Sequence, residues 1–245
     1  MARLFFLMAL VVMLAGCAQS LPSPLPDVLL LGEQHDEPEH QQWHRRTVEQ
    51  LAQRGQLAAV ALEMAEQGRS TAGLPRDASP EQVKAALAWD DKGWPWTAYG
   101  PAVMAAVAAG VPVLGANLPR ARQREVMADA SLEDTVTTSV LQAQKEAVRT
   151  GHCDLLPDSQ LRPMVRVQLA RDRAMAQVLR QAARPGQTVV LIAGARHADP
   201  ALGVPLHLDG GLQAYSRIWP AGPPKQDYCA GLRRQLDKDK DKSSS

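Results

Sequence analysis

Residues 27–35 read DVLLLGEQH, and residues 188–197 read TVVLIAGARH. Each stretch is an almost unbroken apolar run that ends in a Gly-x-x-His turn. Apolar residues at every position, rather than at every second one, are typical of a strand that is buried on both faces. Such strands occur in parallel sheets that helices cover on both sides. The two stretches therefore predict an α/β fold with a histidine after each of two central strands.

The rest of the chain alternates between similar strands and longer helical patterns. The predicted strands are residues 27–31, 57–62, 111–115 and 188–193, with an edge strand at 214–219. The predicted helices are residues 37–54, 79–90, 101–109, 131–149 and 159–183. The second helix begins clearly at Ser79-Pro80-Glu81-Gln82, which combines a serine cap, an early proline and a capping-box glutamine. We expect a central, mostly parallel sheet with helices on both faces, in a single domain over residues 27–220.

The first 26 residues indicate location rather than fold. A basic start and an apolar run from Leu4 to Leu14 have the order and length of a signal peptide, which is too short to span a bilayer. Leu14-Ala15-Gly16-Cys17 is similar to a bacterial lipobox, which predicts removal of residues 1–16 and acylation of Cys17, for example with palmitate. Residues 17–26 then form a proline-rich tether. A secretory signal with a chance cysteine is the alternative.

The residue after Cys17 and the net charge indicate where the protein lies and which class of partner is excluded. No aspartate directly follows Cys17, and among Gram-negative lipoproteins this favours the outer membrane, facing the periplasm. Removal of residues 1–16 takes away one charged residue, Arg3, so the formal net charge falls from +1 to about 0. This balance gives no support to nucleic acid as a partner, because nucleic-acid-binding proteins usually carry a basic surface.

The C-terminal extension, residues 221–245, contains one of the two cysteines that remain after Cys17. In an oxidising periplasm Cys153 and Cys229 could pair and tie the extension to the body; two unpaired buried thiols are the alternative. From Leu236 onward lysine and aspartate alternate before a run of serines. We expect this charged tail to be disordered.

Polar residues follow the four central strands at their carboxyl ends, where α/β folds bind ligands. These residues are His35, Glu63, Asn117 and His197. Two imidazoles and a carboxylate that converge there could bind a divalent metal such as zinc or manganese. The alternative is a pair of turns with surface histidines, since one Gly-x-x-His motif is weakly specific.

Two further histidines, His40 and His44, lie four residues apart on one face of the predicted helix at 37–54. Such a pair could hold a metal or flank a haem, and the alternative is a solvated helix face. We expect His44 to lie at the surface. For His40, which is nearer the strand end, both interpretations stay open.

An aromatic group lies within residues 89–99, although the chain has only ten aromatic residues. It comprises Trp89, Trp94, Trp96 and Tyr99, and the intervening Gly and Pro predict a loop. The group could form an apolar platform for a flat ligand such as a porphyrin, or it could fill the core beside the sheet. Composition alone favours the core. Tyr99 adds a phenolic oxygen that can ligate ferric haem iron.

A third polar group lies at residues 151–172. His152 precedes Cys153, and the predicted helix that follows carries Gln168, Arg171 and Asp172 on one face. Polar groups on an otherwise packed helix favour hydrogen bonding to the ligands of a site. For Asp172, a structural salt bridge is the preferred alternative.

Seven motifs, in order from about residue 27 to 219, resemble those of the ChaN-type haem-binding lipoproteins of the TraB/Tiki superfamily. They are Gly32-Glu33-Gln34-His35 with His40, Leu62-Glu63-Met64, Trp94-Pro95-Trp96 with Tyr99, Ala116-Asn117-Leu118-Pro119-Arg120, Gly151-His152-Cys153, Gln168-Leu169-Ala170-Arg171-Asp172, and Ile192-Ala193-Gly194-Ala195-Arg196-His197.

The resemblance implies a haem-binding lipoprotein that assists haem and iron uptake, with haem, a homodimer partner and an uptake receptor as its partners. It also implies a tyrosine ligand to the iron. Tyr99, Tyr215 and Tyr228 are available, and the neighbouring tryptophans favour Tyr99. The residues expected to contact haem are Tyr99, His35, His40, Trp94, Trp96, His152, Arg171 and His197.

Tiki-like members of the wider superfamily resemble metal-dependent hydrolases, either proteases or esterases. Carried over residue by residue, that resemblance implies a metal at His35, Glu63 and His197, with Glu33 as general base for a metal-bound water. Haem binding is the preferred prediction because it accounts together for the lipobox, the aromatic group and the family motifs. Hydrolysis accounts better for the paired Gly-x-x-His turns.

Overall fold

A parallel five-stranded sheet forms the centre of the protein. The computed structural model describes residues 20–208 and 211–243, so the predicted signal peptide and Cys17 lie outside the described residues. The strands follow the order β3-β2-β4-β1-β5, and every neighbouring pair is parallel. They are β1 (Val28–Glu33), β2 (Leu57–Glu66), β3 (Val113–Asn117), β4 (Thr188–Gly194) and β5 (Ala214–Ile218). The predicted α/β class and the edge strand are confirmed.

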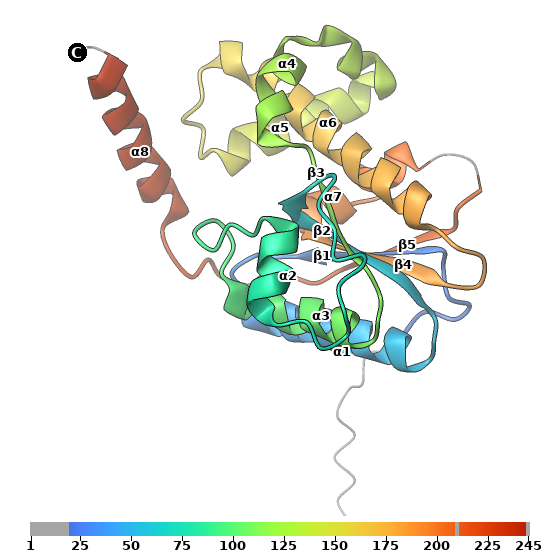
Figure 1. The fold of residues 1–245 in the computed structure, drawn as a ribbon. Coiled ribbons are helices and arrows are strands. Elements are labelled where there is room, and N and C mark those ends of the chain that lie inside the picture. The colour runs from blue at the N-terminus through green and yellow to red at the C-terminus, as the bar shows by residue number, and fades with distance from the viewer. Residues whose placement is uncertain (1–19, 209–210, 244–245) are drawn as a thin grey trace, which may run out of the picture.

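Helices cover both faces of the sheet (Figure 1). One face carries α1 (Pro38–Gln53), α2 (Pro80–Leu87) and α3 (Trp96–Ala108), and the other carries α4 (Gln123–Ala128), α5 (Thr138–Gly151) and α6 (Asp158–Ala182). One-turn α7 (Ala195–Ala198) follows β4, and α8 (Tyr228–Ser243) ends the described chain. Short 3-10 turns occur at Arg120–Arg122, Ala130–Thr135 and Val204–His207.

Alternate residues of each central strand enter two different cores. In β1, Leu29 and Leu31 pack with α1 and α3, whereas Val28 and Leu30 pack with α6. All six residues of β1 and all seven of β4 are buried. This two-sided burial explains the continuous apolar runs, because a residue on either face of the strand must leave water.

The aromatic segment differs from the prediction of a loop with a helix from residue 101. Helix α3 begins at Trp96 and continues through Pro101. A proline inside a helix removes one backbone hydrogen bond. The first turns bury Tyr99 and Gly100, and this packing outweighs the lost bond.

The segments at both ends of the domain are more ordered than expected. Residues 20–26, predicted as a tether, lie on the body: Leu21 and Leu25 pack against the core beside α1, and Arg217 donates to the Ser20 carbonyl at 2.7 Å. Residues 236–243, which were predicted to belong to a disordered tail, lie in α8, and this helix extends away from the body (Figure 1).

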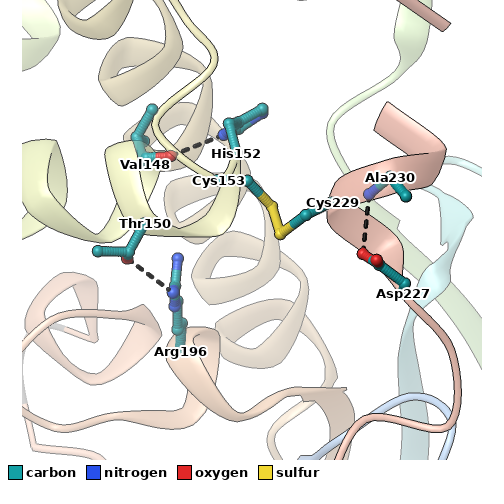
Figure 2. The surroundings of a disulfide bond; sticks show 8 residues. All are labelled: Val148, Thr150, His152, Cys153, Arg196, Asp227, Cys229 and Ala230. Atoms are coloured by element: carbon teal, nitrogen blue, oxygen red, sulfur yellow. Dashed lines mark hydrogen bonds between the residues drawn. A yellow bond between two sulfur atoms is a disulfide. The ribbon is translucent and has the colours of Figure 1, made fainter. Parts of the chain in front are cut away.

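A disulfide joins Cys153 to Cys229, so the open question of their pairing is answered in favour of a bond (Figure 2). The two Cα atoms are 5.6 Å apart and 76 positions apart in sequence. The bond fixes the first turn of α8 to the end of α5. Within the described residues, no helix is long and apolar enough to cross a membrane.

Candidate functional site

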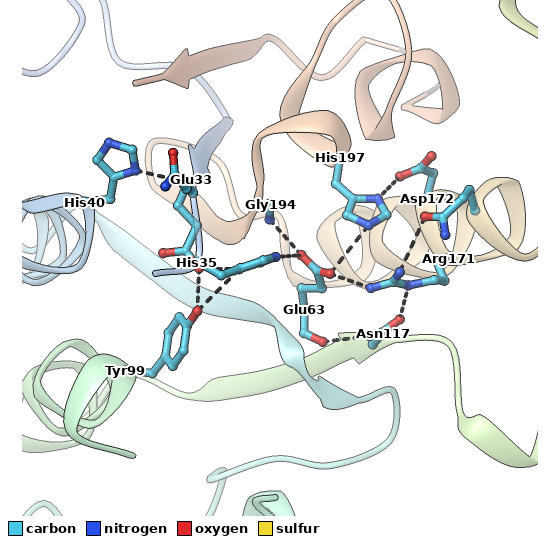
Figure 3. A network of polar contacts seen from close by, with 12 residues as sticks. Glu33, His35, His40, Glu63, Tyr99, Asn117, Arg171, Asp172, Gly194 and His197 are labelled. Carbon is cyan, nitrogen blue, oxygen red and sulfur yellow. Dashed lines mark hydrogen bonds and ion pairs between the residues drawn. The ribbon is translucent and has the colours of Figure 1, made fainter. Parts of the chain in front are cut away.

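The carboxyl ends of β1, β2 and β4 bring three of the predicted residues together (Figure 3). The Glu63 carboxylate lies between two imidazoles: its Oε2 is 3.9 Å from Nε2 of His35, and its Oε1 is 3.5 Å from Nε2 of His197. His35 lies in the turn after β1 and His197 in α7 after β4. The parallel sheet explains this convergence, since all its strands end at one edge.

Each of these histidines is oriented from behind by a second carboxylate. Glu33 Oε1 is 2.7 Å from Nδ1 of His35, and Asp172 Oδ1 is 2.5 Å from Nδ1 of His197. A carboxylate at Nδ1 favours the tautomer that carries its proton on Nδ1, and the lone pair is then on Nε2, the nitrogen nearer Glu63. Histidines that ligate metals are commonly oriented in this way.

Glu63 is held ionised by its neighbours. Its carboxylate pairs with the Arg171 guanidinium and accepts the Gly194 N–H at 2.7 Å. Burial alone would raise the pKa of Glu63, but His197, Arg171 and His35 together lower it from 4.5 to about 2. Asn117 completes the group, because it donates to the Glu63 carbonyl at 2.8 Å and accepts from Arg171 Nε at 2.9 Å.

One member of each outer pair, His35 and Asp172, has a shifted pKa as well. Burial opposes the charge on His35, yet the hydrogen bond to Glu33 and the charge of Glu63 raise its pKa above the ordinary value. Burial raises the pKa of Asp172, and its contact with His197 offsets only part of that rise. The His35 side chain is 39% exposed and that of His197 is 9% exposed, so of these two histidines His35 is the one that an incoming ligand can reach.

The glycines of the two Gly-x-x-His turns are required for space rather than for an unusual backbone conformation. Gly194 has φ −57° and ψ 147°, which other residues adopt. A Cβ at Gly194 would lie 2.9 Å from Nε2 of His35, and one at Gly32 would lie 2.9 Å from the Ala198 Cβ. Glycine is therefore needed at both positions because the chain passes close to other atoms there.

Tyr99, the favoured iron ligand, lies inside the protein. Its side chain is 2% exposed, and its hydroxyl donates to Glu33 Oε1 at 2.6 Å. Burial and the Glu33 charge raise the pKa of Tyr99 strongly, which disfavours the phenolate that ligates iron. The geometry therefore contradicts the ligand role and makes Tyr99 a support for Glu33.

The proposed general-base role of Glu33 meets the same obstacle. The Glu33 side chain is fully buried, and its Oε1 already contacts both His35 and Tyr99. A general base must reach the proton that it removes. Within the described residues, the Glu33 carboxylate contacts His35, Tyr99 and His44, so its role is to orient His35.

His40 and His44 are both buried, and the prediction that His44 lies at the surface was wrong. Trp219, which follows β5, packs on both rings, at centroid distances of 5.6 Å and 5.4 Å. No pattern in the sequence indicated that Trp219 would cover this helix face. His40 accepts the Gln34 N–H at 2.9 Å and so fixes the loop before α1, away from the ligand-accessible side of His35.

The tryptophans largely form a core group, and only one contacts the site. Trp94 lies edge-on to the His35 ring at 4.8 Å. Trp96 instead packs against Trp89 at 5.1 Å, and Trp89 donates to the Trp94 carbonyl. The predicted haem contact through Trp96 is therefore not supported by its position.

A cavity of about 680 Å³ opens beside His35, within the size range of small-molecule sites. The expected residues His152, Arg171 and His197 line it, together with Arg196. Nδ1 of His152 is 2.7 Å from the Val148 carbonyl, so its Nε2 is the nitrogen left for a ligand. Within the described residues, no three His, Cys, Asp or Glu side chains form a group that could hold a metal ion.

Sequence reasoning missed two residues that shape this cavity, Asp36 and Gln144, and treated Tyr228 only as one of three available tyrosines. Tyr228 lines the cavity from the C-terminal extension, and its hydroxyl donates to Asp36 Oδ2 at 2.7 Å. Gln144 donates to the Leu202 carbonyl at 2.9 Å. The pairing of Cys153 with Cys229 was the available signal, because it brings Tyr228 next to His152.

Comparison with known proteins identifies the domain. Residues 25–208 match the family model described as haem-binding uptake, Tiki superfamily, ChaN. The chain belongs to this family. Its ChaN domain includes His35, Glu63, Arg171 and His197, whereas Tyr228 lies beyond the matched residues. The resemblance drawn from the seven motifs is confirmed.

A solved structure described as cofacial heme binding to ChaN of Campylobacter jejuni is similar to this ChaN family member. The two share 26% identity with a TM-score of 0.66, over 82% of this chain and 84% of the other. Among curated proteins, none matches the sequence significantly.

Proposed function

We propose that the protein binds haem in the cavity beside His35. Membership of the ChaN family and likeness to a haem-binding ChaN support this function. The observation that carries it is the exposed imidazole of His35, whose Nδ1 is fixed by Glu33. Its Nε2 is thereby available to an iron atom that enters the cavity.

The residues around the cavity suit the parts of a haem. Of the three tyrosines, Tyr228 reaches the cavity and is the alternative ligand to His35. Arg171 and the exposed Arg196 carry positive charge for the propionate carboxylates, which guanidinium groups bind well. Bound haem would supply an iron centre, while this chain supplies a ligand, counter-charge and the walls of the site.

A hemin titration of the purified protein tests this proposal and the choice of ligand. The protein should give a saturable shift of the Soret band, which His35→Ala should abolish or displace and Tyr228→Phe should leave in place. Tyr215→Phe, on the exposed edge strand β5, is the matched control. Loss of the band in Tyr228→Phe alone would assign the iron to that phenol, and the absence of any saturable shift in the unaltered protein refutes haem binding.

We also propose that the protein acts in haem and iron uptake as a lipoprotein of the outer membrane, facing the periplasm. The apolar run before Cys17 and the lipobox-like sequence support the anchor. Two copies could meet around haem, and an uptake receptor is the expected partner. Incorporation of labelled palmitate into the protein, and its loss in Cys17→Ser, test the anchor; hemin-dependent dimerisation in solution tests the pairing of copies.

A metal-dependent hydrolase is the second candidate, because Nε2 of His35 and of His197 flank the same carboxylate of Glu63. Against it, the two oxygens of Glu63 already contact Arg171 and the Gly194 N–H, and a guanidinium repels a divalent cation. Elemental analysis for zinc and manganese decides between the two. Metal that is lost in both His35→Ala and His197→Ala would support hydrolysis, whereas metal retained by both variants ends it.

A further inference from the structure

The C-terminal segment returns to the site after leaving the sheet. Residues 221–229, which we call the strap, run from the end of β5 to the first turn of α8. Ala221 and Tyr228 of the strap line the cavity beside His35. The strap lies beyond residue 208, where the match to the family model ends.

Polar contacts fix the middle of the strap to the loop that carries His35. Asp36 Oδ2 accepts both the Tyr228 hydroxyl at 2.7 Å and the Lys225 N–H at 3.0 Å. The Lys225 ammonium lies 2.9 Å from Glu37 Oε2. The strap is thus joined to the loop after β1 at Asp36 and Glu37, the two residues that follow His35.

The disulfide fixes the end of the strap to the opposite wall (Figure 2). Cys153 directly follows His152, which lines the cavity at the end of α5. The same end of α5 is joined to α7 by Arg196, which donates to Thr150 Oγ1 at 3.3 Å. The strap therefore bridges the loop after β1 and the end of α5.

The two attachments differ greatly in strength. Lys225 and Tyr228 are exposed, although their partners Glu37 and Asp36 are half-buried, and such polar contacts can exchange with water, unlike a covalent bond. Beyond the disulfide, α8 extends away from the body (Figure 1). The covalent bond is therefore the attachment that decides whether the strap stays in place.

We propose that the strap is part of the haem site, and that the Cys153–Cys229 disulfide keeps it closed and so slows haem exchange. This inference rests on the proposed haem binding. Reduction by a dithiol breaks the S–S bond: the donor gives two electrons and two protons, both cysteines become thiols, and the donor becomes a disulfide. The freed strap then leaves the cavity wall, and haem exchanges faster.

The test measures haem release from the full-length protein loaded with hemin. Excess apomyoglobin captures released hemin, and the Soret band reports the rate. The unaltered protein, the same protein reduced with dithiothreitol and alkylated before loading, and the double variant Cys153→Ser/Cys229→Ser are compared. We expect release to be about tenfold faster in the reduced protein and in the double variant, and reduction to leave the double variant unchanged.

Limited proteolysis without haem provides the second readout, since an open strap should be cut within residues 221–229 at least as fast as α8, whereas the closed strap is protected. Gln235→Ala, exposed on α8, is the control variant. Equal release rates in the oxidised, reduced and double-variant proteins overturn the inference while haem binding stands. If the unaltered protein binds no hemin, the proposed function fails, and this inference fails with it.

Discussion

Glu63 is the most informative position for a stability test, because its buried carboxylate connects both histidines to Arg171. Its pKa falls from 4.5 in the unfolded chain to about 2 in the folded protein. A group with a lowered folded pKa stabilises the fold above its unfolded pKa, and that contribution is lost as the pH falls toward the folded value. Glu63→Gln removes the charge and keeps the shape.

The size of the effect follows from the two pKa values. At about 1.4 kcal/mol for each tenfold change in the ionisation constant, ionisation of Glu63 contributes about 3 kcal/mol to the free energy of unfolding at pH 7. Roughly 2 kcal/mol of this is lost between pH 7 and pH 3. The stability difference between the unaltered protein and Glu63→Gln should therefore shrink by about 2 kcal/mol over that interval.

Urea unfolding followed by circular dichroism at pH 7, 5 and 3 measures this difference. Glu146→Gln, which alters an exposed carboxylate on α5, should show a stability difference that stays within about 0.5 kcal/mol at all three pH values. A difference for Glu63→Gln that is the same at pH 7 and pH 3 would show that the Arg171 and histidine contacts do not stabilise the ionised carboxylate.

Three further substitutions address the supports of the site. Gly194→Ala should lower stability by about 1–3 kcal/mol and weaken hemin binding, because the new Cβ lies 2.9 Å from Nε2 of His35. Burial lowers the pKa of His44 to about 4, so as the pH falls the unfolded chain takes up this proton before the folded protein does. This difference lowers the free energy of unfolding between pH 6.5 and pH 4, and His44→Leu should make that decrease smaller. Tyr99→Phe should cost about 1.5–3 kcal/mol through the lost hydrogen bond to Glu33, while the Soret maximum of bound hemin stays in place.

Each of these substitutions has a result that counts against its reasoning. Gly231→Ala in α8, where a Cβ meets nothing closer than 4.0 Å, controls for the general effect of replacing glycine, and equal effects at both positions would remove the close-approach argument. If the free energy of unfolding of His44→Leu falls more steeply between pH 6.5 and pH 4 than that of the unaltered protein, the imidazole is not buried in its neutral form. A Soret maximum displaced to that of a different axial ligand in Tyr99→Phe would restore the phenol as a ligand.

The fold was predictable because the central strands are buried on both faces and are therefore apolar at nearly every position before their carboxyl ends. The short length and the β-branched residues of runs such as 188–193 favour a covered parallel strand over a buried helix. The start of α3 was not predictable in the same way. Local loop-forming residues predicted a later start, and only the burial of Tyr99 against the sheet explains the extra turn.

The location of the site was predictable, because α/β folds bind ligands at the carboxyl ends of their strands, and His35, Glu63 and His197 all follow such ends. The roles of its supporting residues were not predictable. Whether Tyr99 faces a ligand or the core depends on the partner Glu33, which is 66 positions away. His44 was expected at the surface because helix spacing gives a face but does not show that Trp219 covers it.

The packing of residues 20–26 against the body has a consequence for how the protein meets a membrane. If Cys17 is acylated as proposed, three residues connect the lipid to Ser20, whose carbonyl is bonded to Arg217 of β5. Three extended residues reach at most about 11 Å. The β5 edge would then lie nearest to the lipid headgroups, and this limit of about 11 Å would restrict how far the cavity beside His35 can stand from the bilayer.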